Sequence, residues 1–348
     1  MSGQRKISIG SFNYYIGCAM LGVVLAHTIG LFPEESLPIF VRAVFEVITY
    51  IGVAGFAVIS GYKLKLPDNL KRYVFRTVSK FIKLYSAFGI VTVIMFGIIH
   101  FLCFHYLKGS LTETFLMAVG FLFAVYPSIP IGDHMIYSCG PMYFFVAFMM
   151  AELISVVVLL KVKKHVEIVF ISLMLIGSAL STLLPGMPFA LSYVMLFTGC
   201  VYAGYDLKRK SFLEKGIDFK SSVILIVLSV VIHFFGKLSF VKTFESFFTM
   251  SAGVLAGLVL INLCFNLAEN KNKFNSIIKE IGRFSFLVVG AHTIEYFAIP
   301  WYLVVDKTQG LHVEISLITI YVVRLALIYI IVKCSLFLTK KRKKFLNA

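Results

Sequence analysis

The chain reads FNYYIGCAMLGVVLAHTIGLF from Phe12 to Phe32. An apolar run of about 20 residues is the length at which an α-helix crosses a bilayer, so this stretch predicts a membrane-spanning helix. It contains one histidine, His27, the type of side chain best suited to exchange protons near neutral pH. An imidazole in an apolar span costs free energy to place, which makes His27 a candidate functional residue. Taken alone, a hydrogen bond from this ring to a neighbouring helix explains it equally well.

The composition extends this prediction to the whole chain. Of its 348 residues, 59% are hydrophobic and 14% are charged, and the mean hydropathy is +0.91. Soluble proteins carry roughly 25% charged residues. We therefore expect one polytopic membrane domain over residues 1–348. The first span lacks an Ala-x-Ala-like cleavage site, so we expect it to remain as a helix rather than to act as a signal peptide.

Apolar runs separated by charged loops predict an all-α integral membrane bundle of ten spans. The expected spans are about 12–32, 38–62, 84–106, 141–160, 166–184, 188–205, 221–238, 244–268, 284–305 and 315–338. A shorter run, 111–126, is expected to form an extra re-entrant or interfacial helix on the outer side. Counting it as a crossing would reverse the sidedness of every later loop. Trp301 and Tyr302 are expected in an outer aromatic belt.

The basic residues predict the orientation. Most of the 33 Lys and Arg residues lie near the termini and in alternate loops. The remaining loops carry only Lys108, Lys237, Lys242 and Lys307. The positive-inside rule then places both termini in the cytoplasm. The formal charge of +16 is explained by these short loops, so we expect no nucleic-acid partner. The histidines and cysteines show no metal-ligand spacing, and we expect no metal site.

Polar residues recur in four places within or beside the spans. Arg42 and Glu46 are four apart on the second span, where they can pair or line a polar cavity. The other groups are Ser60-Gly61, the basic set Arg76, Lys80 and Lys83, and Ser285 with His292 and Glu295. Each has an ordinary structural explanation. Small residues permit close helix packing, and lysines at span ends extend to the lipid headgroups. A histidine and a glutamate three residues apart on a helix can form a hydrogen bond with each other.

Together and in this order, these features resemble the acyltransferase-3 family of integral membrane O-acyltransferases, over essentially the whole chain. The matching motifs are Leu21-Gly-Val-Val-Leu-Ala-His27, Phe56-Ala-Val-Ile-Ser60-Gly61-Tyr62, Lys80-Phe-Ile-Lys83 and Ser285-Phe286 with His292. The two lysines replace the family's usual arginines, and Val289 replaces a tyrosine. The family also has an arginine where this chain has Ile16. That departure leaves open a diverged activity, with Arg42, Arg324 or Glu46 as candidate replacements.

The resemblance implies a membrane O-acyltransferase, with acetyl as the expected group. A cytoplasmic acyl-CoA, as in acetyl-CoA, would be the donor substrate, and no cofactor would be bound permanently. The acceptor would be a hydroxyl of an extracytoplasmic or lipid-linked glycan such as capsule, at the bacterial plasma membrane. The implied roles are His27 as catalytic base or acyl carrier, Lys80, Lys83 and Arg76 as donor-binding residues, and Arg42, Glu46, Ser60, Gly61, Ser285, His292 and Glu295 as pocket or tunnel lining.

Two other functions remain compatible with the sequence. A transporter or flippase of lipid-linked sugar would use His27, Arg42, Glu46 and His292 to line a permeation path. A catalytically silent family member would serve as an assembly partner. We favour the enzyme because the polar residues concentrate in the first and ninth spans, whereas transporters tend to carry paired broken helices in both halves.

Overall fold

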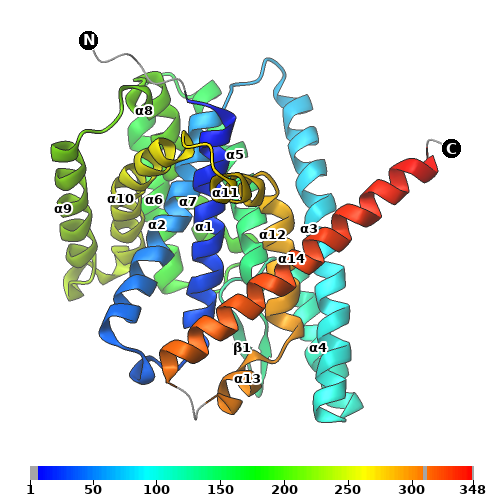
Figure 1. Cartoon of the computed structure of the whole chain (residues 1–348). Helices are drawn as coiled ribbons and strands as arrows, with labels where there is room; N and C mark the ends of the chain where they lie inside the picture. Colours follow the sequence, from blue (N-terminus) through cyan, green and yellow to red (C-terminus); the bar gives the residue numbers. More distant parts are fainter. Residues whose placement is uncertain (1–6, 309–311, 347–348) are drawn as a thin grey trace.

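Long helices make up most of the molecule (Figure 1). The computed structural model describes residues 7–308 and 312–346, and the chain is 83% helical. Its small β-hairpin pairs β1 (Ile129–Ile131) antiparallel with β2 (His134–Ile136). The remaining short elements are the 3₁₀ helices η1 (Glu34–Ser36), η2 (Gly140–Met142), η3 (Pro188–Ala190) and η4 (Ser239–Phe244). The all-α prediction is confirmed.

In the described part of the chain, nine helices are long and apolar enough to cross a membrane. They contain α1 (Ile9–Ile29), α2 (Ile39–Lys63), α3 (Leu70–Phe104), α5 (Tyr143–Lys161), α6 (Val166–Leu183), α7 (Leu191–Arg209), α9 (Phe219–Gly236), α10 (Glu245–Ala268) and α14 (Val313–Leu346). Helices α12 (Ser285–Ala298) and α13 (Trp301–Lys307) meet at an angle of 65° and are long and apolar enough only together, as a tenth, broken span or as a re-entrant loop. Pro300 lies at this bend, where its ring and missing N–H prevent a continuous helix.

Three further helices lie between the spans. The short helix predicted between the third and fourth spans is α4 (Leu107–Leu122), which packs along α3. A single turn, α8 (Phe212–Lys215), follows α7. The predicted loop after the eighth span contains α11 (Lys273–Arg283), a helix that the sequence analysis did not expect. The Asn272 side chain begins α11 by accepting a hydrogen bond from the Asn275 N–H at 2.7 Å, and the helix buries Ile278.

Helix α1 occupies the middle of the bundle, where it contacts α2, α10, α11, α12 and α14 (Figure 1). Its closest neighbour is α11. A Cβ at Gly17 would overlap the carbonyl oxygen of Ile278, and one at Gly282 would overlap that of Asn13. Only glycine permits this approach of two helix backbones. The packing fixes α11, and the start of α12 that follows it, against the first half of α1.

The outward faces of the peripheral helices are apolar. Val227 and Val231 on α9, and Ile90, Ile94 and Ile98 on α3, are all exposed. Exposed apolar side chains repeated at helical spacing are typical of a surface that faces lipid tails. This surface agrees with a multi-pass membrane protein.

Candidate functional site

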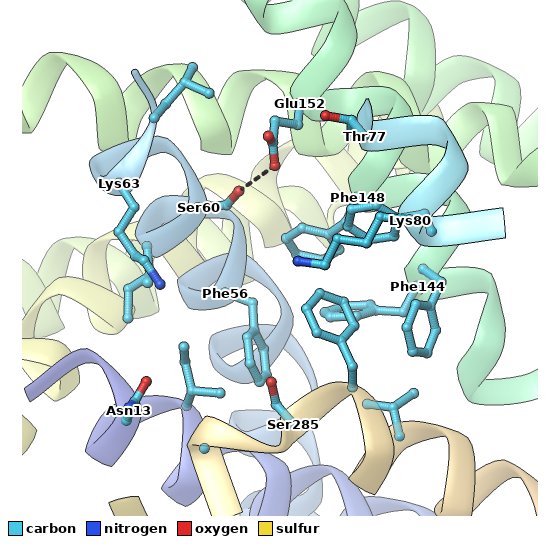
Figure 2. Close-up of a pocket in the computed structure, with 18 of the residues that line it drawn as sticks. Asn13, Phe56, Ser60, Lys63, Thr77, Lys80, Phe144, Phe148, Glu152 and Ser285 are labelled. Carbon is cyan, nitrogen blue, oxygen red and sulfur yellow. Dashed lines mark hydrogen bonds between the residues drawn. The ribbon is translucent and has the colours of Figure 1, made fainter. Parts of the chain in front are cut away.

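A cavity of about 630 Å³ lies where α1 begins and α2 ends (Figure 2). Its walls come from α1, α2, α3, α5 and α12, together with the end of α11. On α1, Asn13, Ile16 and Met20 line it at intervals of about one turn. Pockets of this volume commonly hold small molecules of the size of a nucleotide or cofactor.

Positive charge dominates the lining of the cavity. The charged lining residues are Lys63, Lys65, Arg76, Lys80, Arg283 and Glu152. Figure 2 shows the side chains of Lys63 and Lys80 reaching into the space from α2 and α3. Arg76 and Lys80 are one turn apart on α3 and share a face. Cations gathered in this way attract a ligand with several negative charges, such as a set of phosphates.

Glu152 on α5 is the one carboxylate among the described residues that line the cavity. It accepts hydrogen bonds from the Ser60 hydroxyl at 3.4 Å and from the Tyr73 hydroxyl, and so connects α2, α3 and α5 (Figure 2). Glu152 was not among the candidate residues predicted from the sequence. An ionisable side chain inside an apolar span was the signal that could have identified it.

Aromatic rings form the inner part of the cavity. Phe144 and Phe148 of α5 lie 4.2 Å apart between ring centroids, and Phe56 of α2 lies 5.5 Å from Phe144. Deeper residues on α1 and α12 are Met20 and Val289. The cavity is therefore cationic towards the helix ends and apolar within the bundle. This combination fits an amphipathic ligand with a charged head and a less polar arm.

His27 lies beyond this apolar part, towards the other end of α1. It follows Met20 by seven residues, which is about 10 Å along a helix, and α1 ends two residues later at Ile29. The ring is half-buried, with its centroid 5.1 Å from that of His292 and 5.3 Å from that of Tyr296. Three spans thus bring polar groups together around His27: α1, α12 and α14.

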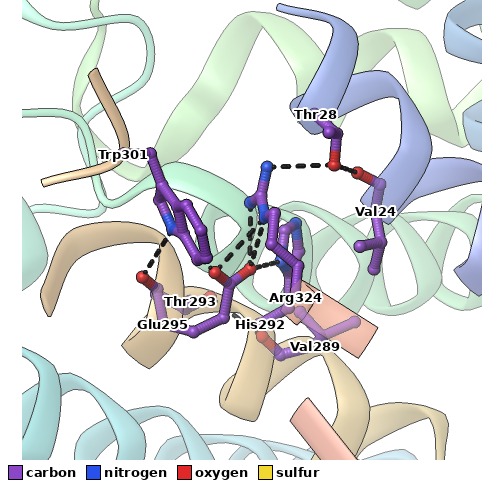
Figure 3. Close-up of polar contacts among 8 residues, drawn as sticks. All are labelled: Val24, Thr28, Val289, His292, Thr293, Glu295, Trp301 and Arg324. Atoms are coloured by element: carbon purple, nitrogen blue, oxygen red, sulfur yellow. Dashed lines mark hydrogen bonds and ion pairs between the residues drawn. The ribbon is translucent and has the colours of Figure 1, made fainter. Parts of the chain in front are cut away.

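A buried ion pair supports this second cluster (Figure 3). Arg324 of α14 donates to Glu295 of α12, with Nη2 to Oε1 at 2.9 Å and Nε to Oε1 at 3.1 Å. Trp301 also donates to the carboxylate, from Nε1 to Oε2 at 2.9 Å. Both members of the ion pair are at most 1% exposed. The Glu295 carboxylate has two further hydrogen-bond partners, Trp301 and His292. A buried charge without such partners would be costly.

The same pair positions the two histidines. Glu295 Oε1 lies 2.6 Å from Nδ1 of His292, while Nε2 of His292 has no hydrogen-bond partner among the residues that the structure describes. On the other side, Arg324 Nη1 donates to the Thr28 hydroxyl at 3.2 Å. Because Thr28 follows His27 directly, this contact connects α14 to the end of α1. We call His27, His292, Glu295 and Arg324 the histidine cluster.

The structure places the predicted site residues in three groups. Ser60, Arg76, Lys80 and Ser285 line the cavity, whereas His27, His292 and Glu295 belong to the histidine cluster. Lys83 is exposed and is not a lining residue. Gly61 faces away from the cavity, because a Cβ there would overlap the carbonyl oxygen of Val201 on α7. Adjacent residues on α2 therefore serve the cavity and the helix packing separately.

Arg42 and Glu46 lie elsewhere. Glu46 is exposed and forms an ion pair with Lys237 of α9, with 2.9 Å between Nζ and Oε1. Neither residue lines the cavity. Among the candidates for a polar group near His27, Arg324 is the one that the structure brings beside it. Ile16, at the position of the family's arginine, lines the cavity.

The two residues that were expected in an outer aromatic belt differ in exposure. Tyr302 is exposed, but Trp301 is 4% exposed and donates to Glu295. The bend at Pro300 turns the indole into the bundle instead of towards headgroups. The belt prediction for Trp301 was therefore wrong, because sequence position at a span end does not specify which way a broken helix faces.

The fold and these two sites define a polytopic membrane protein with a cation-lined cavity on one side of a buried histidine cluster. The family model of the acyltransferase-3 acyltransferase domain matches residues 11–336, nearly the whole chain. The chain belongs to this family and is a membrane acyltransferase. No curated protein and no solved structure matches it.

Proposed function

We propose that this protein is an O-acetyltransferase that moves an acetyl group from cytoplasmic acetyl-CoA, or another acyl-CoA, to a glycan hydroxyl on the opposite side of the membrane. The observation that carries the proposal is the cation-lined cavity, whose inner lining is aromatic and reaches Met20 on α1, the helix that also carries His27. The expected setting is the bacterial plasma membrane, with surface or lipid-linked glycan as acceptor and membrane lipid around the bundle.

The donor fits the cavity by charge and by shape. Arg76, Lys80 and Lys63 would hold the phosphates of coenzyme A, because cations grouped on neighbouring helices bind phosphate oxygens with charge-assisted hydrogen bonds. The thioester arm would lie against the rings of Phe56, Phe144 and Phe148. By the positive-inside rule this end of the bundle faces the cytoplasm, where acyl-CoA is present.

The acyl group then has to pass Met20 and Val289 to reach His27. The remaining distance is about 10 Å along α1, which a long flexible arm can span once these two side chains turn aside. Methionine is well suited to such a movement because it is unbranched and has several rotatable bonds. At His27 the ring would act as general base on the acceptor hydroxyl, or carry the acyl group briefly itself. Its place near the end of α1 favours access for a glycan from the far side.

The test is the substitution His27→Ala in a deletion strain complemented with each variant. General-base assistance is typically worth 10²- to 10⁴-fold, so we expect the O-acetyl signals of the surface polysaccharide to disappear from its proton NMR spectrum. The matched control is His100→Ala, a half-buried histidine on α3 whose Nδ1 is hydrogen-bonded to Ser110 at 2.8 Å. Unchanged acetylation in a folded His27→Ala variant would contradict the proposal.

A flippase of lipid-linked sugar is the second candidate, favoured by the broken span α12–α13 beside buried charges. The two functions differ in their need for the donor. A transferase releases free coenzyme A from acetyl-CoA and loses that activity when Arg76 and Lys80 are both changed to Gln. A flippase, or a catalytically silent family member, releases none. Ile16, at the position of the family's arginine, is the residue that favours a silent member.

A further inference from the structure

His292 carries an unused proton-accepting atom beside the proposed catalytic ring. The ring is 1% exposed, and its Nε2 has no hydrogen-bond partner among the described residues. A buried polar atom without a partner is costly and needs an explanation, and a role in catalysis is one such explanation. His292 lies on α12, whereas His27 lies on α1, and their ring centroids are 5.1 Å apart.

The carboxylate of Glu295 determines which nitrogen of His292 bears the hydrogen. An ionised carboxylate only accepts hydrogen bonds, so the 2.6 Å contact with Glu295 Oε1 requires the N–H of His292 at Nδ1. Arg324 and Trp301 donate to both oxygens of that carboxylate, and hydrogen bonds to a carboxylate favour its charged form. The neutral ring is therefore held with a bare lone pair at Nε2, the arrangement in which an imidazole acts as a base.

We propose that His292 is a second proton-accepting residue of the transfer site, whose Nε2 takes up the proton that His27 removes from the acceptor hydroxyl. This inference rests on the proposed acyl transfer. Glu295 and Arg324 are positioning residues in it, because they hold His292 rather than contact the substrate. The groups that surround the two rings are Glu295 and Tyr296 of α12 and Arg324 of α14.

The proton balance of the step is complete with groups already named. The hydroxyl oxygen forms a bond to the acyl carbon as its O–H bond breaks, and one nitrogen of His27 receives that proton. The N–H on the other nitrogen of His27 passes its proton to Nε2 of His292, whose positive charge Glu295 stabilises. When the C–S bond breaks, the sulfur leaves with the electron pair. The proton then returns through His27 to the thiolate, which gives the free thiol of coenzyme A.

The experiment uses the full chain in lipid nanodiscs, with acetyl-CoA as donor and water in place of the acceptor hydroxyl. Release of coenzyme A is followed with a thiol reagent. In His292→Gln the side chain still donates to Glu295 but cannot hold a proton. We expect kcat to fall by about 10²-fold, the size of one proton-transfer contribution, while KM for acetyl-CoA and the melting temperature stay unchanged. His100→Gln is the matched control and should retain wild-type turnover.

The outcomes separate this inference from the proposed function. Release by the wild type with a folded His292→Gln variant within threefold of it would overturn the role of His292 and leave the transferase intact. Absence of release by the wild type, with both water and extracted glycan as acceptor, would overturn the proposed function and this inference with it. If Gln at this position prevents folding, His292→Ala with added imidazole replaces it. Restored turnover supports the proposal, because imidazole supplies the missing base, and no restoration contradicts it.

Discussion

The cavity and the histidine cluster hold their charges in opposite ways. In the cavity, Arg76 and Lys80 are exposed and form no ion pair with any residue that the structure describes. In the histidine cluster, Arg324 and Glu295 are buried and are paired with each other. Exposed cations remain available to a ligand at little cost, whereas buried charges depend on each other for their place in the fold. The cavity is therefore suited to bind a charged ligand, and the histidine cluster to hold its side chains in one geometry.

The difference predicts that charge removal destabilises the fold only in the histidine cluster. Arg324→Met leaves the Glu295 carboxylate buried without its counter-ion, and we expect a loss of about 3–5 kcal/mol in the free energy of unfolding. The measurement is equilibrium unfolding of the purified protein in detergent. This is the largest effect that we expect from a single substitution in either site.

The matched control for Arg324→Met is the double variant Glu295→Leu with Arg324→Met. Replacing a buried ion pair by apolar residues of similar size is often nearly neutral. We expect the double variant to recover much of the stability that the single variant loses. Equal stabilities of the single and double variants would contradict the view that the unpaired carboxylate causes the loss.

Hydrophobicity made the spans predictable, because each span depends on its own residues alone. Partners across helices were harder to predict. Arg324 and Glu295 lie 29 positions apart, and Arg324 and Thr28 lie 296 apart. Nothing in the sequence specifies these distances. The local pair His292 and Glu295 was foreseen, since residues three apart on a helix share a face.

Neighbouring residues on one helix show a second limit of the sequence. Ser60 and Gly61 were predicted together, but successive positions differ by about 100° around a helix axis. Ser60 consequently faces the cavity while Gly61 packs on α7. The bend between α12 and α13 has the same consequence for Trp301, since a change in helix direction is not encoded in hydropathy. The sequence predicted which segments contribute to the two sites. The direction in which each side chain points is determined by helix packing and could be seen only in the structure.

Lys80 and Lys83 test the binding role of the cavity, and the expected effects are smaller. Lys80 lines the cavity and lies over the ring of Phe286, with 5.7 Å from Nζ to the ring centroid, whereas Lys83 does not line it. We expect Lys80→Gln to raise the dissociation constant for coenzyme A by about five- to tenfold, as one lost charge contact at a partly hydrated site. Lys83→Gln should change it by less than about twofold. Titration calorimetry at low ionic strength measures both.

The difference between the two dissociation constants shows whether coenzyme A binds in the cavity. Equal effects of the two substitutions would mean that the donor extends over the outer face of α3, and the cavity would not be its main binding site. Neither substitution should change the unfolding free energy by more than about 0.5 kcal/mol, because both lysines are solvent-exposed. A larger loss of unfolding free energy in Lys80→Gln would mean that Lys80 stabilises the fold as the buried charges do. It would contradict the difference between the cavity and the histidine cluster.

Glu152 gives the smallest and most selective test, because it is the carboxylate within a positive cavity. In Glu152→Gln the negative charge is lost, the amide oxygen can still accept one of the two hydrogen bonds from Ser60 and Tyr73, and the amide N–H group can donate to the other hydroxyl. We expect coenzyme A to bind about two- to fivefold more tightly, the effect of one like charge acting across a partly hydrated space. Glu34→Gln, in the turn after α1, is the control and should leave binding unchanged. Weaker binding in Glu152→Gln would show instead that the carboxylate contacts the donor directly, as an acceptor for one of its N–H or O–H groups.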